Sequence, residues 1–406
     1  MSAQKDMILV VNSGSSSLKF MLFKMANETM IVKGLVERIG TKEANLIYQR
    51  AGMAKIERPI EALDHSTALA TVCKTLVDPE IGVLKSLSEV DAIGHRVVHC
   101  GEAYSDSVAV AEKDKEIVRN CIELSPLHNP ANLDGISACE KVFPGVLNVA
   151  VFDTAFHQTM PKYAYMYALP KKFYDVYRIR KYGFHGTSHK FVTYATADYL
   201  KKPVEELNAV ICHLGNGSSL SAIKNGKVLD TTMGLTPLAG VIMGTRCGDI
   251  DPSVIFTLAH KGYSIDEIDH ILNKESGLKA INGIGSADMR DTIAAANSGN
   301  EDAKNALQMF AHHIALYIGG YFTLIGGADA IVFTGGIGEN SSEARKLILD
   351  RLVALGCVLD PAKNDAIHGS VGVITKDGAK VPAIVIPTNE ELMIARDTYR
   401  IFKEQK

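Results

Sequence analysis

Two segments of the chain share one arrangement of apolar and polar residues. In residues 7–23, an apolar strand leads into the Gly/Ser loop 12–17 and then into a strand in which apolar residues alternate with others. Residues 209–223 repeat this order around the loop 215–219. A Gly-rich turn with small hydroxyl side chains exposes backbone N–H groups to an anion that approaches closely. A single turn of this kind is more often a plain hairpin, but the pair predicts a phosphate clamp between two related lobes.

The strands that follow the two loops continue the repeat. A turn near residues 26–28 precedes a strand over 30–39, and the pair Asn225-Gly226 predicts a hairpin turn before a strand over 227–232. Strands alternate with helical stretches along the rest of the chain. This alternation indicates an α/β protein with a weak internal repeat.

We therefore expect two lobes. The first spans residues 1–155 and the second spans residues 156–387, with the boundary after a strand that ends at Asp153 and before a Pro- and Tyr-rich stretch. A C-terminal helix over 388–406 is expected to return to the first lobe.

Three segments carry helical signals. Thr388, three residues before Glu391, predicts a capping box at the start of the last helix. A loop over 333–340 is expected to join an apolar strand to a helix over 341–355. The apolar stretch 314–328 is interrupted by glycines and is shorter than the roughly 20 residues that a membrane helix needs, so we interpret it as a buried helix and turn.

The composition is that of an ordinary globular protein. Of the 406 residues, 47% are apolar and 22% are charged, and the net charge of −3 gives no basic field that favours nucleic acid or an anionic membrane. No apolar segment of signal-peptide length follows a basic N-terminus. Seven scattered cysteines without a Cys-x-x-Cys pair indicate reduced thiols, small core residues and a cytoplasmic protein.

Several common motifs are absent or incomplete. The chain has neither the P-loop nor the dinucleotide-binding pattern Gly-x-Gly-x-x-Gly after a strand. Ser16-Ser-Leu-Lys19 matches the nucleophile motif of penicillin-recognising serine enzymes, but it precedes a strand and its partner motifs are missing. His185 and His189 have helical spacing, yet the glutamate of zinc proteases does not follow the first histidine. Paired hairpin loops would therefore be a different solution to phosphate binding.

Two arginines stand out by their context. Arg96 ends an apolar segment, and Arg246 lies in a Gly-rich loop over 243–251. Either could pair with a nearby carboxylate such as Asp249, which is the commoner role of a single arginine. A transferring phosphoryl group, however, spreads its charge over three oxygens, and arginine is its usual counter-charge. The residues alone leave both interpretations open.

Two carboxylates are equally open to two interpretations. Asp153 ends a strand and is either a turn residue or a Mg²⁺ ligand. Glu390 starts a helix and either interacts with the helix dipole or holds Mg²⁺.

The chain resembles the acetate kinase family over its whole length. The resemblance rests on these segments: VNSGSSSLKF (11–20), GHRVVH (94–99), PLHNPANL (126–133), VFDTAFHQTMP (151–161), YGFHGTSH (182–189), HLGNGSS (213–219), MGLTPL (233–238), MGTRCGDIDP (243–252), FTGGIGEN (333–340) and IPTNEEL (386–392).

The resemblance implies a fold and a reaction. The fold is a duplicated actin-like ATPase (ribonuclease H-like) fold with a nucleotide cleft between two lobes. The reaction is reversible, direct in-line phosphoryl transfer between ATP and acetate, giving acetyl phosphate and ADP in acetyl-CoA biosynthesis. Mg²⁺ is the expected cofactor, with Mn²⁺ as an alternative, and ATP is the co-substrate. The expected assembly is a homodimer formed through the C-terminal lobe, which also binds the nucleotide, and no nucleic-acid or membrane partner is expected.

The resemblance also assigns roles to individual residues. The catalytic residues are Asp153, Arg96, Arg246 and His185, of which His185 and Arg246 stabilise the transition state; His128 and Asn216 lie beside the transferring group. The metal-associated residues are Asn12 and Glu390. The acetate site is assigned to Arg96, Val98, Leu127, Phe184 and Pro237. The nucleotide is assigned to Ser15, Ser17, Lys19, His213, Gly215, Asn216, Gly217, Asp288, Met289, Arg290, Gly335, Gly336, Ile337, Gly338 and Asn340.

Selectivity and rival functions depend on few residues. The branched side chain of Val98 leaves little room for an extra methylene, so we expect acetate to be preferred to propionate. A propionate or broad short-chain acyl kinase is the alternative. A non-catalytic actin-like ATPase is a rival of a different class, but it leaves Arg96, His185 and Arg246 unexplained.

The chain departs from the family pattern at Cys100, Ala239 and Cys247. Because Cys247 lies beside Arg246 in the sequence, we hypothesise that the activity is sensitive to oxidation of this thiol.

Overall fold

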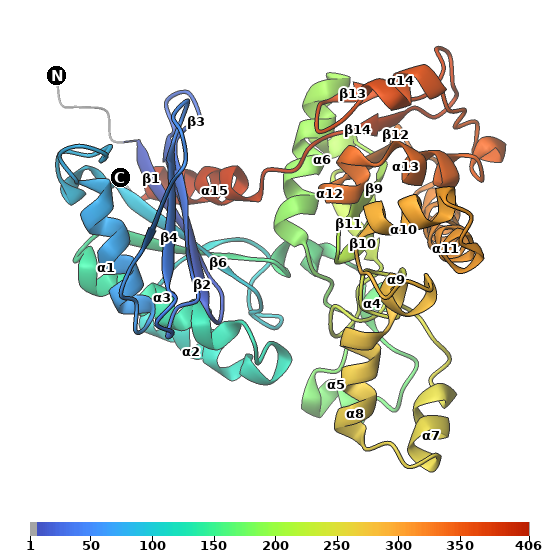
Figure 1. Cartoon of the computed structure of the whole chain (residues 1–406), viewed down its shortest axis with the longest axis horizontal. Helices are drawn as coiled ribbons and strands as arrows, with labels where there is room; N and C mark the ends of the chain where they lie inside the picture. Colours follow the sequence, from blue (N-terminus) through green and yellow to red (C-terminus); the bar gives the residue numbers. More distant parts are fainter. Residues whose placement is uncertain (1–5, 406) are drawn as a thin grey trace. The chain divides into compact units, whose positions relative to one another are not determined.

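The computed structural model describes residues 6–405, which divide into two compact units (Figure 1). The first unit contains the residues up to Gln158 together with those from Asn389 onward, and the second contains residues 159–388. The chain therefore leaves the first unit once and returns to it with its last helix. The sequence analysis placed these two crossings at residues 155–156 and 387–388.

The first unit is built on a mixed sheet with strand order β5-β4-β3-β2-β1-β6-β8-β7. Its strands are β1 (Met7–Ser13), β2 (Ser17–Lys24), β3 (Thr29–Glu37), β4 (Asn45–Arg50), β5 (Ile56–Pro59), β6 (Ala92–Val97), β7 (Val108–Ala109) and β8 (Leu147–Phe152). Its helices are α1 (His65–Leu76), α2 (Glu112–Asn120), α3 (Asn129–Val142) and α15 (Glu390–Glu404), with short 3-10 turns η1 (Leu87–Glu89), η2 (Ile122–Leu124) and η3 (Ala155–Thr159).

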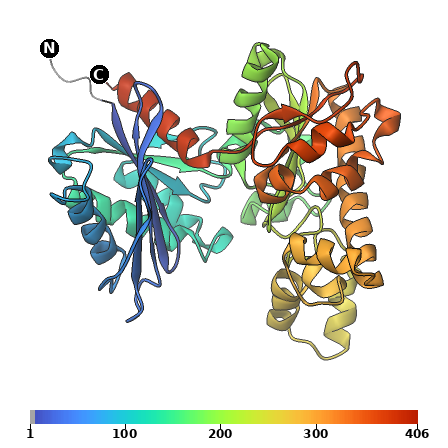
Figure 2. The same ribbon diagram turned by 45° about the horizontal axis from the view of Figure 1, so that its top comes forward.

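Helices cover both faces of this sheet (Figures 1 and 2). On one face, Leu9 of β1 packs in a core with Leu69 of α1 and Cys139 of α3. On the other face, Val10 of β1 packs with Ile394 of α15. Alternate residues of β1 thus point into two different cores, which explains why its residues 8–11 are apolar without interruption.

The second unit contains a mixed sheet with strand order β11-β10-β9-β12-β14-β13. Its strands are β9 (Ala209–Leu214), β10 (Ser218–Lys224), β11 (Lys227–Thr231), β12 (Ala330–Thr334), β13 (Gly372–Val373) and β14 (Ala383–Val385). Its helices are α4 (Lys162–Tyr165), α5 (Lys172–Tyr177), α6 (Gly186–Leu200), α7 (Ser253–His260), α8 (Ile265–His270), α9 (Gly277–Ile281), α10 (Met289–Asn297), α11 (Glu301–Ile325), α12 (Gly335–Asn340), α13 (Ser342–Leu349) and α14 (Pro361–Ala366), with η4 (Val204–Glu206), the π-turn η5 (Ile271–Glu275) and η6 (Val353–Leu355).

The internal repeat predicted from the sequence is present in the sheet topology. In the first unit, β1 is antiparallel to β2 and parallel to β6, which is parallel to β8. In the second unit, β9 is antiparallel to β10 and parallel to β12, which is parallel to β14. Both predicted Gly/Ser loops join the first two strands of this common core. The Asn225-Gly226 turn is also confirmed, because it joins β10 to β11 with positive φ at both residues, as a type I′ turn requires.

Two helix predictions are wrong in detail. The N-cap of α15 is Asn389, whose side chain accepts a hydrogen bond from Leu392 N, whereas the Thr388 hydroxyl bonds to Ser188. Most of the predicted loop after β12 is the short helix α12, which begins at Gly335 with a positive φ of 76°. The helix that follows it ends at Leu349, not at residue 355.

The long helix α11 contains most of the apolar stretch 314–328. The predicted helix and turn are present: Ile314, Ile318 and Ile325 are buried, whereas Leu316 is 61% exposed, so the helix is buried on one side only. Among residues 6–405, no helix is long and apolar enough to cross a membrane. The cysteines are free and, apart from the half-buried Cys247, they are core residues as predicted.

The close packing of α15 on β6 gives a stability prediction. A Cβ at Gly94 would collide with Thr398 Oγ1 and would lie 2.7 Å from Ile394 Cγ2, both on α15. We expect Gly94→Ala to lower the free energy of unfolding by about 1–3 kcal/mol, because overpacking shifts the helix. Urea unfolding followed by circular dichroism measures this, since the chain has no tryptophan.

Gly320→Ala is the control for this prediction. A Cβ at this helical position of α11 meets nothing within 4 Å, so the same substitution should raise stability by about 0.5–1 kcal/mol. An unchanged midpoint for Gly94→Ala would contradict the packing of α15.

Candidate active site

The carboxyl ends of parallel strands gather the predicted residues of the first unit. The loop 12–17 follows β1, Arg96 lies near the end of β6, and Asp153 directly follows β8. Because these three strands are parallel neighbours, their ends lie at one edge of the sheet. The edge therefore brings together residues from 12 to 153, which are far apart in the sequence.

Arg96 and Asp153 form a two-pronged ion pair. Arg96 Nη2 lies 2.5 Å and Nε 3.0 Å from Asp153 Oδ2, and the aspartate side chain is only 4% exposed. The negative charge of Asp153 is the main reason that the pKa of Arg96 is raised above its ordinary value. The ion-pair interpretation of Arg96 is thus correct, and its partner is Asp153.

Glu390 lies in a crowded group of charges. Burial, together with the nearby Asp153 and Glu391, raises the pKa of this carboxyl to about 7 against the opposing effect of Arg96 and Lys19. Three carboxyls thus share one region with two cationic side chains, and the negative charge is only partly balanced.

The partly unbalanced negative charge around Glu390 is relevant to the predicted Mg²⁺ site. Among residues 6–405, no cluster of three His, Cys, Asp or Glu side chains forms a complete metal cage. Mg²⁺, however, is commonly held by one or two carboxylates together with substrate phosphates and water. An under-neutralised carboxyl such as Glu390 fits that ligand set, and the amide of Asn12, at the end of β1, supplies an oxygen of the right type.

Two buried asparagines, which the sequence analysis did not select, tie this edge together. Asn132 Oδ1 accepts a hydrogen bond from Val98 N at 3.1 Å, and its Nδ2 donates to Ser13 O at 2.9 Å. Asn129 Oδ1 accepts from His99 N, and its Nδ2 donates to His99 O. Both lie on the first turn of α3. Asn132 holds the segments at Val98 and Ser13, and Asn129 holds the segment at His99. In the sequence, the only sign of this role is a pair of asparagines three positions apart at the start of a helix.

The remaining predicted residues of the first unit differ in exposure. Ser15, Lys19 and His128 are exposed, and Ser17 is half-buried. Of the two predicted acetate-site residues in this unit, Val98 is buried and Leu127 is 66% exposed.

The second unit has an edge of the same kind. The loop 215–217 follows β9, α12 follows β12, and residues 386–388 follow β14. These strands are also parallel neighbours, so the three segments lie at one edge.

At this edge, His185 and Arg246 converge on Gly217. A Cβ at Gly217 would lie 3.6 Å from His185 Nε2 and 3.3 Å from Arg246 Nη1. A side chain at residue 217 would occupy the space that these two groups border. An arginine guanidinium beside an imidazole nitrogen is suited to an anion when that nitrogen carries a hydrogen.

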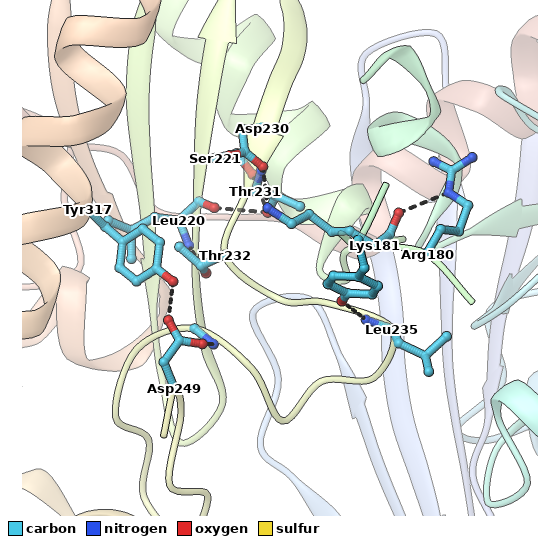
Figure 3. A network of polar contacts seen from close by, with 12 residues as sticks. Arg180, Lys181, Leu220, Ser221, Asp230, Thr231, Thr232, Leu235, Asp249 and Tyr317 are labelled. Carbon is cyan, nitrogen blue, oxygen red and sulfur yellow. Dashed lines mark hydrogen bonds and ion pairs between the residues drawn. The ribbon is translucent and has the colours of Figure 1, made fainter. Parts of the chain in front are cut away.

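Among the described residues, no carboxylate pairs with Arg246. Arg246 Nη1 donates to Pro237 O at 3.0 Å, and burial lowers the pKa of the guanidinium. Asp249, considered above as its partner, instead accepts hydrogen bonds from Gly240 N and from the Tyr317 hydroxyl (Figure 3). Asp249 therefore closes the loop that carries Arg246 and leaves the guanidinium charge uncompensated.

Cys247, next to Arg246, is not an activated thiol. Its Sγ lies 3.1 Å from Gly248 O, and burial raises the pKa of the thiol. Since the thiolate is the reactive form, this environment argues against the hypothesis of oxidation-sensitive activity.

The rings of His213 and His185 are in contact, with centroids 4.4 Å apart and planes tilted by 30°. Its Nδ1 lies 2.8 Å from Ser188 Oγ, which is also 2.8 Å from Thr388 Oγ1. A Cβ at Gly215 would lie 3.9 Å from His213 Nε2. Both imidazoles therefore direct Nε2 towards the loop 215–217.

A pocket of about 840 Å³ in the second unit takes in most of the predicted adenosine-side residues. It is lined by Gly215, Asn216, Ala287, Asp288, Met289, Arg290, Ile293, Gly336, Ile337, Asn340, Ser341 and Glu343. Four other predicted nucleotide-site residues are close in sequence to the lining residues but do not line the pocket: His213, Gly217, Gly335 and Gly338. Its volume is within the range of small-molecule sites.

Four of the lining residues were missed from the sequence, and the first of them, Ala287, directly precedes the predicted Asp288. Ile293 lies one turn beyond Arg290 on α10, and Ser341 and Glu343 begin α13 after the predicted loop. No motif marks them. Their position follows only from the packing of α10, α12 and α13 around the pocket.

The other two predicted acetate-site residues belong to the second unit. Phe184 is buried directly before His185, and Pro237 is half-buried with its carbonyl on Arg246. Each unit thus carries two apolar members of the predicted acetate site.

Known proteins resemble this chain along its full length. The family model described as the acetokinase family matches residues 7–396. An acetate kinase of Caldicellulosiruptor saccharolyticus is 52% identical over 399 residues, which cover 98% of this chain and 100% of that protein.

Two solved structures extend the comparison to the fold. A Porphyromonas gingivalis acetate kinase has a TM-score of 0.94 at 41% identity and covers 98% of this chain and 99% of its own. A propionate kinase from Francisella tularensis has a TM-score of 0.90 at 42% identity. The match covers 98% of this chain and 100% of the propionate kinase chain. These findings confirm the resemblance and the duplicated α/β fold class predicted from the sequence, and the chain belongs to the acetokinase family.

Proposed function

We propose that this protein catalyses reversible, direct in-line phosphoryl transfer between ATP and acetate, with acetyl phosphate and ADP as products. Membership of the acetokinase family and 52% identity to a relative named acetate kinase support a phosphotransferase that uses ATP and acetate. The observation that carries the proposal is the guanidinium of Arg246. It lacks a carboxylate partner within the described chain and lies beside His185 Nε2 at an open glycine.

The chemistry of the acceptor explains why the site needs positive groups more than a base. Acetate is already ionised at neutral pH, so no general base has to remove a proton. Asp153 is engaged by Arg96 and is assigned to orientation, not to proton transfer. The barrier is the repulsion between the acetate anion and the polyanionic nucleotide.

Three side chains are assigned to offset that repulsion. Arg246 and His185 donate to the oxygens of the transferring phosphoryl group, whose charge grows at those positions in flight. Arg96, fixed in direction by Asp153, faces the carboxylate of acetate, with Val98 two positions further along the chain beside its methyl group. The nucleotide lies with its adenosine in the pocket beside Asp288, and its phosphates reach the loop 215–217.

Mg²⁺ is proposed as the cofactor, held by Glu390 and Asn12 together with nucleotide oxygens, and Mn²⁺ is an alternative. When bound, the ion supplies neutralisation of phosphate charge. The unbalanced carboxyl group at Glu390 supports this assignment. Asp153 keeps Arg96 in place in the same region.

The setting of the enzyme is proposed from the family and the thiols. We infer a homodimer formed through the second unit, a place in the cytoplasm where free thiols persist, and a role in acetyl-CoA biosynthesis.

Propionate kinase is the second candidate, because a solved structure with that title is 42% identical to this chain. Acetate is favoured since the buried, branched Val98 leaves less room for a longer acyl chain.

Trapping of the product tests the proposal directly. Purified protein with Mg²⁺, ATP and hydroxylamine should form acetohydroxamate from acetate, and omission of the metal should abolish the signal. Nucleotide binding without any hydroxamate from acetate, propionate or butyrate would indicate a non-catalytic actin-like ATPase instead.

The two arginines give the first activity prediction. Arg96→Ala and Arg246→Ala should each lower kcat by about 10²–10³-fold, because each removes one charged donor from the transition state. Arg38→Ala, which removes an exposed arginine paired with Glu43, should leave kcat unchanged. Near-normal turnover in either active-site variant, with circular dichroism unchanged, would contradict the assignment.

The loop that carries Arg246 gives a second prediction. Tyr317→Phe removes the hydroxyl that donates to Asp249. Because a hydrogen bond to a charged group contributes about 1.5–3 kcal/mol, kcat should fall by roughly tenfold as Arg246 loses its fixed position.

Tyr321→Phe is the matched control, one turn away on α11. The Tyr321 hydroxyl is buried without a hydrogen-bond partner among the described residues, so its loss should leave kcat unchanged and stability equal or higher. Equal kcat in the two variants would show that the Asp249 contact does not position Arg246.

Acyl selectivity depends on Val98 in the third prediction. Val98→Ala should raise the ratio of kcat/KM for propionate over acetate by about tenfold, since one methylene is worth roughly 1–3 kcal/mol in an apolar pocket. Val149→Ala, at a buried position of β8 in the same unit, controls for lost packing. An unchanged ratio in Val98→Ala would place the acyl pocket elsewhere.

A further inference from the structure

Ser219 lies between two histidines at the edge of the second unit. Its Oγ is 3.0 Å from His185 Nδ1 and 2.8 Å from His189 Nε2. Ser219 and His189 are fully buried, so water does not supply substitutes for these hydrogen bonds. The two imidazoles follow one another by one turn at the start of α6, and β10 places the hydroxyl between them.

A hydroxyl carries a single proton, and this couples the two histidines. Ser219 can donate to one imidazole nitrogen while it accepts from the other. If Ser219 donates to His185 Nδ1, His189 Nε2 must carry the hydrogen that Ser219 accepts. If His185 Nδ1 carries a hydrogen, Ser219 accepts it and donates to His189 Nε2, because its own hydrogen needs an acceptor at this buried position.

The position of His185 Nε2 selects between these arrangements. This atom faces the open space at Gly217, next to Arg246 Nη1. A neutral imidazole protonated on Nδ1 would present a lone pair to a phosphoryl oxygen, which is repulsive. An imidazole protonated on Nε2 would present a donor.

We propose that Ser219 is a positioning residue that keeps neutral His185 in the tautomer with its hydrogen on Nε2. His189 Nε2–H orients the serine hydroxyl, whose own hydrogen is donated to His185 Nδ1. This inference rests on the proposed phosphoryl transfer, because only an anion at Gly217 requires a donor there.

The neighbouring histidine has the same arrangement. His213 Nδ1 lies 2.8 Å from the buried Ser188 Oγ, and its Nε2 also faces the loop 215–217. Each imidazole at this loop therefore has a serine behind Nδ1. A hydrogen bond at one ring nitrogen fixes which nitrogen carries the proton, as it does for metal-bound and catalytic histidines.

β10 offers a matched control. Ser221 is two residues after Ser219 on the same strand and equally buried, but its hydroxyl donates to Thr231 Oγ1 at 3.1 Å (Figure 3), and it has no hydrogen bond to a histidine among residues 6–405. Ser219→Ala and Ser221→Ala thus remove the same group from the same strand.

The kinetic test compares these two variants. Ser219→Ala should lower kcat by about 10- to 100-fold, the range found when a partner behind a ligating histidine is removed, while KM for ATP stays within about twofold. Ser221→Ala should retain full kcat. Equal kcat in the two variants would overturn the proposal, and so would a Ser219→Ala defect confined to KM.

A spectroscopic test reports the tautomer without relying on turnover. Solid-state nitrogen spectra of the full chain, labelled in its histidines with a heavy nitrogen isotope and assigned with His185→Gln, give the protonation of each His185 nitrogen at pH 8. The wild type should show hydrogen on Nε2 and a bare Nδ1, and Ser219→Ala should show a mixture of tautomers. Hydrogen on Nδ1 in the wild type, or an unchanged spectrum in Ser219→Ala, would overturn the inference.

The spectrum also separates two kinds of failure. If the wild type holds hydrogen on Nε2 but forms no acyl phosphate, the tautomer assignment stands and the proposed function fails. If it forms acyl phosphate with hydrogen on Nδ1, the function stands and the role of Ser219 fails. The wild-type spectrum decides the tautomer even where Ser219→Ala does not fold.

Discussion

Parallel strands end at the same edge of a sheet, and this constraint places the candidate chemistry of each unit. In the first unit, β1, β6 and β8 bring the loop 12–17, Arg96 and Asp153 to one edge. In the second unit, β9 and its parallel neighbours do the same for the loop 215–217 and α12. The antiparallel partner that follows each loop keeps it short.

The two arginines that distinguish these edges are held in opposite ways. Arg96 is neutralised by Asp153, so its direction is fixed by an ion pair that is already formed. Arg246 is directed by the carbonyl of Pro237, which leaves its charge available. Burying an uncompensated cation is unfavourable, and an anion that binds there removes that penalty. The second edge is thus the more strongly prepared for an anion, whereas the first keeps a surplus of carboxyl groups around Glu390.

The sequence predicts features that depend on neighbours along the chain. The strand–loop–strand units, the Asn225-Gly226 turn and the α/β class all follow from local periodicity and turn chemistry. Features that depend on competition between local partners were not predictable. Both Thr388 and Asn389 can cap a helix, and tertiary bonding to Ser188 engages the first, so the second caps α15.

Contacts between residues that are far apart in the sequence could not be predicted either. Asp249 was the nearest carboxylate to Arg246 in sequence, yet Tyr317 from α11 bonds to it. The family resemblance named most residues that line the adenosine-side pocket, but not Glu343, because only packing of separate helices brings it there. The positions of the loops could thus be predicted from local sequence patterns. The interaction partners of the charged side chains on these loops could be identified only from the folded structure.

The return of the chain to its first unit has a consequence for biosynthesis. The second unit is one continuous segment, so it can fold as soon as it has left the ribosome. The first unit lacks α15, which covers one face of its sheet through residues such as Ile394, until the whole of the second unit has been translated. During translation, the N-terminal part of the first unit therefore exposes an apolar face of its sheet until α15 has been synthesised. We expect nascent chains to depend on chaperones at this stage more than the folded protein does.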